Sequence, residues 1–245
     1  MALRHVRFLT TDGLDVPPVT AAGMREIDRI AVEETGPNLF QMMENAGRNL
    51  ALQAIEGLGR DWRERHILVL AGGGGNGGGG ICAARHLANR GAAVTLVVAA
   101  ALQAGSVPAF QQRVYAGTSG REIDADAAHK ERTDLLVDAL IGYGLTSAPR
   151  GIAADLITWA NGTGAPILSL DVPSGVDATT GDTPGAVVRP RWTMTLALPK
   201  TGLRPEHTGQ LVLADIGIPA EAFRRGGLAF VSPFGHRFRI PLTIS

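Results

Sequence analysis

The feature that most constrains the fold is a glycine-rich segment at residues 72–80, which follows a short apolar run and precedes a helical pattern. Asn76 is the only side chain in this segment. Glycine tolerates positive φ and has no Cβ, so successive N–H groups can turn toward one anion at the start of a helix. The succession predicts an α/β protein with a phosphate-binding loop, and we expect the helix to begin near Ile81.

Two common phosphate-binding motifs do not account for this segment. Gly72, Gly74 and Gly77 have the spacing of the dinucleotide fingerprint, but a run so rich in glycine satisfies most such patterns. The fingerprint also needs an acid roughly 20 positions further on, and no Asp or Glu follows before Glu122. The Gly-Lys-Ser/Thr ending of the kinase and ATPase loop is missing too. The segment therefore indicates a phosphorylated ligand bound in a less common way.

Composition is typical of one globular α/β domain. The chain has 245 residues, of which 45% are hydrophobic and 19% charged, enough to bury a full core. We interpret residues 1–245 as a single domain with a core at about 20–219 and a tail or edge extension at 229–245.

Charge and hydropathy argue against nucleic-acid and membrane partners. Lys plus Arg equals Asp plus Glu at 23 each, so no excess of basic charge favours either partner. The longest apolar run, residues 94–102, is too short to span a bilayer, and the N-terminus has no apolar signal core. We therefore expect a cytoplasmic protein.

Hydrophobic periodicity predicts an alternation of helices and buried strands. Helical spacing covers residues 20–34, with Thr20 as N-cap, and residues 39–58, while 107–115 and 124–130 are weaker candidates. Apolar runs without alternation suit strands buried on both faces of a parallel sheet. Such runs lie at residues 66–71, 93–99, 135–140, 166–170, 193–198 and 210–214.

Three loops that follow these strands contain polar residues. They are the glycine segment with Asn76, the segment that begins at Asp138, and the segment that begins at Asp171 and includes Ser174. In an open parallel sheet, ligands bind beyond the carboxyl ends of the strands. Asn76, Asp138 and Ser174 offer only oxygen ligands and suit a hard cation of low charge. The alternative is that Asp138 and Ser174 cap helices and that Asn76 fills a turn.

The order of several motifs resembles the YjeF N-terminal domain family, whose best-known members are NAD(P)H-hydrate epimerases. The match runs from about residue 20 to about 219, and Asp171-Val-Pro-Ser-Gly-Val-Asp is its most specific part. The other matching stretches are Met24-Arg-Glu-Ile-Asp-Arg, Met43-Glu-Asn-Ala-Gly-Arg, the glycine segment with Ala83-Ala-Arg-His-Leu, Val137-Asp-Ala-Leu-Ile-Gly-Tyr-Gly-Leu and Pro199-Lys-Thr-Gly-Leu.

The resemblance implies a Rossmann-like three-layer αβα sandwich with a mostly parallel sheet, often dimeric, so we expect a homodimer. It also implies an isomerase of nicotinamide nucleotide repair, which interconverts the R and S epimers of C6-hydrated NADH or NADPH. By resemblance, a potassium ion would bind Asn76, Asp138 and Ser174, and Asp171 would be the general acid/base. The implied substrate-binding residues are Gly75, Asn76, Gly77, Gly78, Gly79, Gly142, Tyr143, Gly144, Leu145, Thr146, Ser147, Ala148 and Asp171.

At two positions this segment lacks a polar side chain that the family has at the ligand, where the pattern usually reads Gly-Pro-Gly-Asn-Asn-Gly-Gly-Asp-Gly. Gly75 stands where the family has Asn, and Gly79 where it has Asp. Each lost hydrogen bond would cost about 0.5–1.5 kcal/mol. The alternative function is therefore a catalytically weakened relative that serves as a nucleotide-binding or dimeric interaction module.

Several other polar residues have less defined roles. Cys82, the single cysteine, is interpreted as a small buried residue in a helix. Lys200 either meets a phosphate or is solvated, and Glu44 and Asn45 either reach the ligand pocket or serve helix packing and solvation. No role is assigned to the histidines, whose spacing does not suggest metal ligation.

Overall fold

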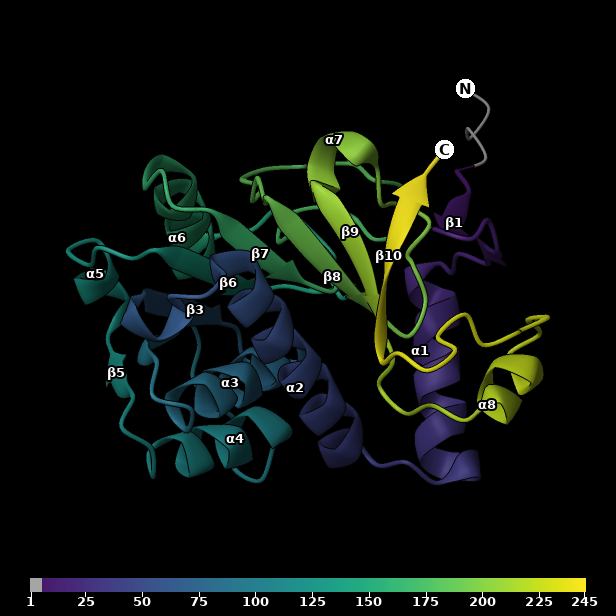
Figure 1. The fold of residues 1–245 in the computed structure, drawn as a ribbon, viewed down its shortest axis with the longest axis horizontal. Helices are drawn as coiled ribbons and strands as arrows, with labels where there is room; N and C mark the ends of the chain where they lie inside the picture. Colours follow the sequence, from purple (N-terminus) through teal and green to yellow (C-terminus); the bar gives the residue numbers. More distant parts are fainter. Residues whose placement is uncertain (1–5) are drawn as a thin grey trace.

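One ten-stranded sheet runs through the molecule in the order β2-β1-β10-β9-β8-β7-β6-β3-β4-β5 (Figure 1). The computed structural model describes residues 6–245. The strands are β1 (Phe8–Thr10), β2 (Asp15–Val16), β3 (His66–Ala71), β4 (Ala93–Val98), β5 (Arg121–Ile123), β6 (Leu135–Ala139), β7 (Ile167–Leu170), β8 (Trp192–Leu196), β9 (Gln210–Ala214) and β10 (Arg239–Ile244).

The helices cover both faces of this sheet. The α-helices are α1 (Ala21–Ile30), α2 (Leu39–Leu58), α3 (Gly75–Ala88), α4 (Val107–Tyr115), α5 (Ala125–Ala128), α6 (Gly151–Gly162), α7 (Pro205–Thr208) and α8 (Ala220–Arg225). A π-helical segment, η1 (Ala31–Thr35), continues α1, and a 3-10 turn, η2 (Trp62–Glu64), precedes β3. Among residues 6–245, no helix has both the length and the apolar character needed to cross a membrane.

The core is divided by the sheet into two layers, as the alternation of side chains along β3 shows. Ile67, Val69 and Ala71 face the core under α2 and α3, while Leu68 and Leu70 face the core under α6. Both sets are fully buried. A continuous apolar run is therefore what a strand in the middle layer of a three-layer sandwich requires.

The parallel part of the sheet has the strand order of a Rossmann fold. From β5 through β4, β3, β6, β7 and β8 to β9, each neighbouring pair is parallel. Successive strands are added toward one edge of the sheet from β3 to β5 and toward the other edge from β6 to β9. Ligands bind at such a reversal of strand order in folds of this kind. The glycine segment after β3 and the loop after β6 flank that point.

Most elements predicted from periodicity are confirmed. The ranges of β3, β9, α2 and α4 match to the residue, and β4, β6, β7 and β8 match within two residues. Thr20 is the N-cap of α1, since its side chain accepts a hydrogen bond from the Gly23 N–H at 3.1 Å. The predicted helix at 20–34 differs in ending as the π-helical segment η1.

The prediction that the helix after β3 begins near Ile81 is wrong. Helix α3 begins at Gly75, so Gly77, Gly78, Gly79 and Gly80 are helical and buried. A Cβ on Gly80 would lie 2.4 Å from the Ala139 Cβ. The close approach of α3 to β6 thus explains glycine at this position, although glycine inside a helix generally destabilises it.

The chain beyond the predicted core also joins the sheet. β10 pairs with β9 on one side and with β1 on the other, and all these pairs are antiparallel. Residues 239–244 therefore extend the sheet, with β1 and β2 lying outside them. The short strands β1 and β2 were not predicted, because three and two residues carry too little periodicity.

Candidate active site

The carboxyl ends of β3, β6, β7 and β8 bring several sequence-predicted residues together. Asp138 is the fourth residue of β6 and is 1% exposed. It accepts hydrogen bonds from the Ser174 hydroxyl at 2.5 Å, the Ser174 N–H at 2.9 Å and the Ser169 hydroxyl at 2.7 Å. Burial raises the pKa of Asp138, and these donors oppose that rise. Asp138 and Ser174 are thus in direct contact.

Asn76 lies in the first turn of α3 and faces the loop after β6. Its Oδ1 is 3.0 Å from where a Cβ on Gly142 would stand. The Ser174 hydroxyl accepts from the N–H of Ile141, the neighbour of Gly142, at 2.9 Å. The Asn76 Nδ2 is buried and has no hydrogen-bond partner among residues 6–245. Asn76 therefore adjoins the segment that Ser174 contacts, with one side of its amide unsatisfied.

Asp171 directly follows β7 in a left-handed conformation, with φ 67°. Such a conformation costs a non-glycine residue about 1–3 kcal/mol and occurs often at functional sites. Its Oδ1 accepts from Lys200 Nζ and from the Leu196 N–H at 3.2 Å. Its Oδ2 accepts from the Tyr143 N–H at 3.3 Å. The side chain is held firmly at Oδ1 and only by one long contact at Oδ2.

Lys200 is neither solvated nor a surface group, and that part of the sequence interpretation is wrong. The residue is 1% exposed, and its ammonium group forms an ion pair with Asp171. It also donates to the Leu196 carbonyl at 2.8 Å and to the Leu198 carbonyl at 3.1 Å. A buried lysine requires such partners because an unpaired charge in the interior is costly. Lys200 follows the predicted strand at 193–198, so the strand-end argument applied to it as well.

Asp28 was not identified as a site residue from the sequence, although its position one helical turn after an apolar residue indicates that it faces inward. It lies one helical turn after the buried Met24 on α1 and is half-buried. The Tyr143 hydroxyl donates to Asp28 Oδ2 at 2.5 Å. Burial is the main cause that raises the pKa of Asp28, and the Tyr143 hydrogen bond opposes it. Tyr143 thus connects Asp28 on α1 with Asp171 after β7.

The rest of the predicted substrate loop, residues 142–148, is irregular. Gly144, Thr146 and Ser147 are exposed, whereas Leu145 and Ala148 are half-buried. Ala148 lies against Gly185, whose added Cβ would be 3.0 Å from the Ala148 Cβ. Exposure at the strand ends leaves this loop accessible to a ligand from solution.

The two positions that lack the family's polar side chains have different surroundings. A Cβ on Gly75 would meet no atom within 4 Å among the described residues, and Gly75 is exposed. A Cβ on Gly79 would be 2.8 Å from Leu170 Cδ2 and near Ala46 and Met43. A side chain at Gly75 therefore has room, while one at Gly79 displaces apolar neighbours.

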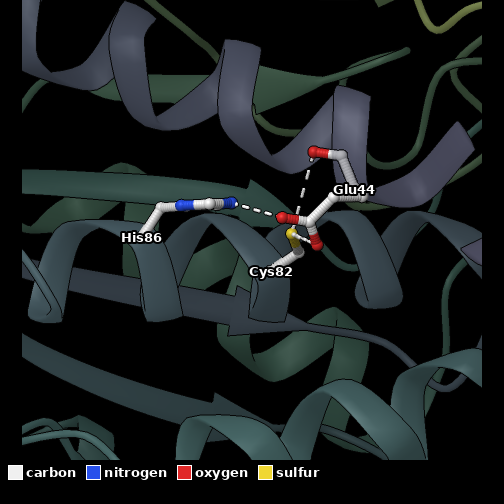
Figure 2. Close-up of side chains that lie close together, drawn as sticks. All are labelled: Glu44, Cys82 and His86. Carbon is white, nitrogen blue, oxygen red and sulfur yellow. Dashed lines mark hydrogen bonds and ion pairs between the residues drawn. The ribbon is translucent and has the colours of Figure 1, made fainter. Parts of the chain in front are cut away.

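Glu44 and Asn45 contact neighbouring elements. Glu44 bonds to residues of α3, and the Asn45 amide donates to the Ile216 carbonyl at 3.1 Å. Cys82 is buried, as expected. His86, to which no role was assigned, has its Nε2 2.8 Å from Glu44 Oε1 (Figure 2). Glu44, Cys82 and His86 form a second polar cluster between α2 and α3.

The fold and this arrangement define a class: Rossmann-like αβα proteins with a polar site at the reversal of strand order. The solved structure of yeast ynu0 is similar to this chain with a TM-score of 0.80 and 21% sequence identity. The match covers 92% of this chain and 100% of the yeast chain.

Sequence comparison identifies the family. The family described as "YjeF-related protein N-terminus" matches residues 39–202, and the chain belongs to this family. It is 51% identical to "NAD(P)H-hydrate epimerase" from Dehalogenimonas lykanthroporepellens, over 98% of each chain. A protein of that name from Rhodopirellula baltica is 35% identical over 86% of this chain and 89% of its own. The "Bifunctional NAD(P)H-hydrate repair enzyme Nnr" of Salinibacter ruber is 37% identical, and the match spans 42% of its length.

Proposed function

We propose that this protein is an NAD(P)H-hydrate epimerase, an isomerase that interconverts the R and S epimers of C6-hydrated NADH and NADPH. The observation that carries the proposal is the 51% identity to a protein of that name over 98% of both chains. The buried Asp171 and Lys200 pair at the strand ends supports it, because it provides a fixed proton-transfer group at the ligand edge of the sheet.

Asp171 is the proposed general acid/base. Its Oδ1 is fixed by Lys200 and the Leu196 N–H, so the weakly bonded Oδ2 is the oxygen available to a substrate. A proton moves to and from this oxygen as the C6 hydroxyl leaves and returns, or as the ring opens and closes. Lys200 touches Asp171 from inside the protein and acts as a positioning residue.

The first turn of α3 and the loop 142–148 are the proposed substrate-binding segments. The first N–H groups of a helix have no acceptor within the helix and attract phosphate. Here they belong to Gly75, Asn76 and Gly77, after the N-cap Gly74. Tyr143 and its neighbours border the other side of the strand-order reversal and would contact the sugar or ring.

A potassium ion is proposed at Asn76, Asp138 and Ser174. The donors fit a monovalent cation, since all three offer oxygen and Asp138 supplies one charge. The unsatisfied Asn76 amide supports the fit. A half turn of the amide exchanges its oxygen and nitrogen, and the oxygen then points to the side where Nδ2 has no hydrogen-bond partner. A bound ion would neutralise Asp138 and fix the loop after β6. We also propose that the protein is a homodimer, as the family resemblance implies, and that it acts in the cytoplasm.

The test of catalysis is epimerisation of the pure R hydrate in potassium buffer. Asp171→Asn should still fold and bind substrate, although it removes the charged partner of Lys200 and lowers stability. Its turnover should fall by about 10²- to 10⁴-fold, the usual contribution of a general acid/base. Asp155→Asn, the same substitution at an exposed position of α6, is the matched control and should keep the wild-type turnover. A wild-type protein without activity, and without recovery in Gly75→Asn combined with Gly79→Asp, would favour the non-catalytic module instead.

The potassium site has a test that does not depend on activity. Replacing potassium by tetramethylammonium should lower the thermal stability of the wild type, because a bound ion stabilises the folded state by mass action. Asn76→Ala should remove this dependence. Equal melting temperatures of the wild type in the two salts would contradict the site.

A further inference from the structure

The polar cluster between α2 and α3 has the composition of a transition-metal site. Cys82 and His86 are four residues apart on α3 and therefore share one face of that helix, and Glu44 of α2 points toward them (Figure 2). One ligand atom from each residue lies within 4.8 Å of the other two. None of the three belongs to the residues proposed for substrate or potassium.

Close helix packing fixes this convergence. A Cβ on Gly47 of α2 would stand 2.4 Å from Cys82 Sγ, so glycine at this position is what lets α2 approach α3. Cys82 Sγ is 3.3 Å from Glu44 Oε2, and His86 Nε2 is 2.8 Å from Glu44 Oε1. The sulfur, nitrogen and oxygen donors are thus held by two rigid helices and not by a loop.

A cation already lies where these donors converge, and it is the guanidinium of Arg85. Its Nη2 is 2.5 Å from Glu44 Oε2 and 3.3 Å from both Cys82 Sγ and His86 Nε2. The Nε of Arg85 is buried without a hydrogen-bond partner in residues 6–245. The Arg85 side chain is 15% exposed and that of Glu44 is 39% exposed, so the cluster borders solvent. The guanidinium can turn toward solvent, and an ion can enter from it.

We propose that Glu44, Cys82 and His86 form a binding site for a thiophilic divalent transition metal, represented by Zn²⁺, which takes the place of the Arg85 guanidinium. A thiolate, an imidazole and a carboxylate are the ligand types of a tetrahedral zinc site whose fourth position takes water. On binding, the sulfur–metal bond forms, the S–H proton passes to water, and no oxidation state changes.

Metal binding at this place links α2 to α3. The first turn of α3 contains the glycines at the ligand edge of the sheet, and Cys82 and His86 lie further along the same helix. A metal bound to the folded state alone raises stability by mass action. The site would therefore stabilise the helix pair that presents the anion-binding turn, independently of any catalysis.

Cobalt gives a specific readout, because Cys82 is the only cysteine of the 245 residues. Titration of the reduced wild type with Co²⁺ should give a thiolate-to-cobalt charge-transfer band with one ion per chain, and added Zn²⁺ should abolish it. This band reports sulfur ligation, so cobalt bound at surface histidines or carboxylates does not contribute to it. Zn²⁺ should also raise the melting temperature of the wild type.

Four variants and one control identify the remaining ligands. Cys82→Ser should lose both the band and the zinc-induced rise in melting temperature. His86→Gln and Glu44→Gln should each weaken Co²⁺ binding by about tenfold or more. Arg85→Met should strengthen Co²⁺ binding by a similar factor, because it removes the competing cation. Changes of this size are known for groups around metal sites. His236→Gln, at an exposed histidine outside the cluster, should bind Co²⁺ as the wild type does.

Two results would overturn the proposal. One is the absence of a thiolate band in the wild type, including the case in which only Arg85→Met shows it, because the arginine would then close the site permanently. The other is a wild-type band whose Co²⁺ affinity is unaffected by both His86→Gln and Glu44→Gln. The thiolate alone would then bind the ion.

Discussion

At the scale of single residues, Asp171 and Lys200 form a buried ion pair in the candidate site. Both side chains are almost completely buried, at 4% and 1% exposure. Burying two charges is repaid only when their geometry and remaining hydrogen bonds are good. The carbonyls of Leu196 and Leu198 and the N–H groups around Asp171 supply those bonds.

Removing one partner of this pair should destabilise the protein strongly. Lys200→Met leaves the Asp171 carboxylate buried and unpaired, and we expect a loss of about 3–5 kcal/mol in the free energy of unfolding. The variant that combines Lys200→Met with Asp171→Asn should lose less than the sum of the two single variants. Urea denaturation of all four proteins measures this coupling. Simple additivity would mean that the two charges do not stabilise one another.

The sequence located Asp171 and not Lys200 for a physical reason. Asp171 belongs to a specific motif and directly follows a predicted strand, whereas Lys200 lies four residues beyond the end of β8. Lysine is rarely buried, so the residue type alone favours a solvated position for Lys200. Its burial depends on a partner from another strand, which only the pairing of β7 with β8 brings near.

Asp28 should make stability depend on pH in a definite direction. Burial raises its pKa above the ordinary value of 3.8, so the folded state holds the proton more tightly than the unfolded state does. The stabilisation from this group is complete below pH 3.8 and is lost as pH rises through the folded-state pKa. Asp28→Asn removes this titration and keeps an acceptor for Tyr143.

Urea denaturation at several pH values tests the role of Asp28. The free energy of unfolding of Asp28→Asn, minus that of the wild type, should be larger at neutral pH than near pH 3.8. Glu26→Gln, at an exposed position of the same helix, is the matched control and should not show this increase. A difference that is constant or falls with rising pH would contradict the raised pKa.

At the scale of elements, the glycines of α3 serve close packing in addition to their proposed role in ligand binding. A Cβ on Gly77 would stand 1.8 Å from the Gly72 carbonyl oxygen, so the segment's own backbone forbids a side chain there. A larger residue at Gly77 therefore disturbs the fold of the turn before any ligand arrives. Loss of nucleotide binding in such a variant is not by itself proof of a blocked phosphate site.

Paired alanine substitutions separate these roles. Gly77→Ala should lower the free energy of unfolding by about 1–3 kcal/mol, the cost of overpacking. Gly75→Ala has open space at the first helical position and should be neutral or stabilising by up to about 1 kcal/mol. Chemical denaturation measures both. A Gly77→Ala protein as stable as Gly75→Ala would show that the turn can relax.

Elements were predictable where one short-range pattern decides them. The strands β3 and β9 and the helix α2 have clear apolar patterns, and they and the weaker candidate α4 were located to the residue. The start of α3 was missed because eight glycines carry no helical pattern, and the helix forms through packing against Ala139 and Leu170. The polar cluster of Glu44, Cys82 and His86 was missed because its members come from two helices whose facing sides periodicity alone does not define.

At the scale of the whole molecule, β10 joins two parts of the sheet that are far apart in the sequence. It pairs with β9 and also with β1, so the N-terminal strands reach the parallel sheet through it. Ile240 and Leu242 of β10 are buried, and Pro241 and Thr243 between and after them are exposed. This alternation is that of a strand with one face on the core.

Stability of the whole molecule should therefore depend on one face of β10. Leu242→Ala should lower the free energy of unfolding by about 2–5 kcal/mol, the usual cost of removing a buried leucine. Thr243→Ala, one residue further on and exposed, should change it by less than about 0.5 kcal/mol. Because β1 and β2 attach through β10, hydrogen exchange in residues 8–16 should accelerate in Leu242→Ala more than in Thr243→Ala. Equal exchange in the two variants would mean that β1 and β2 are held by packing that does not depend on β10.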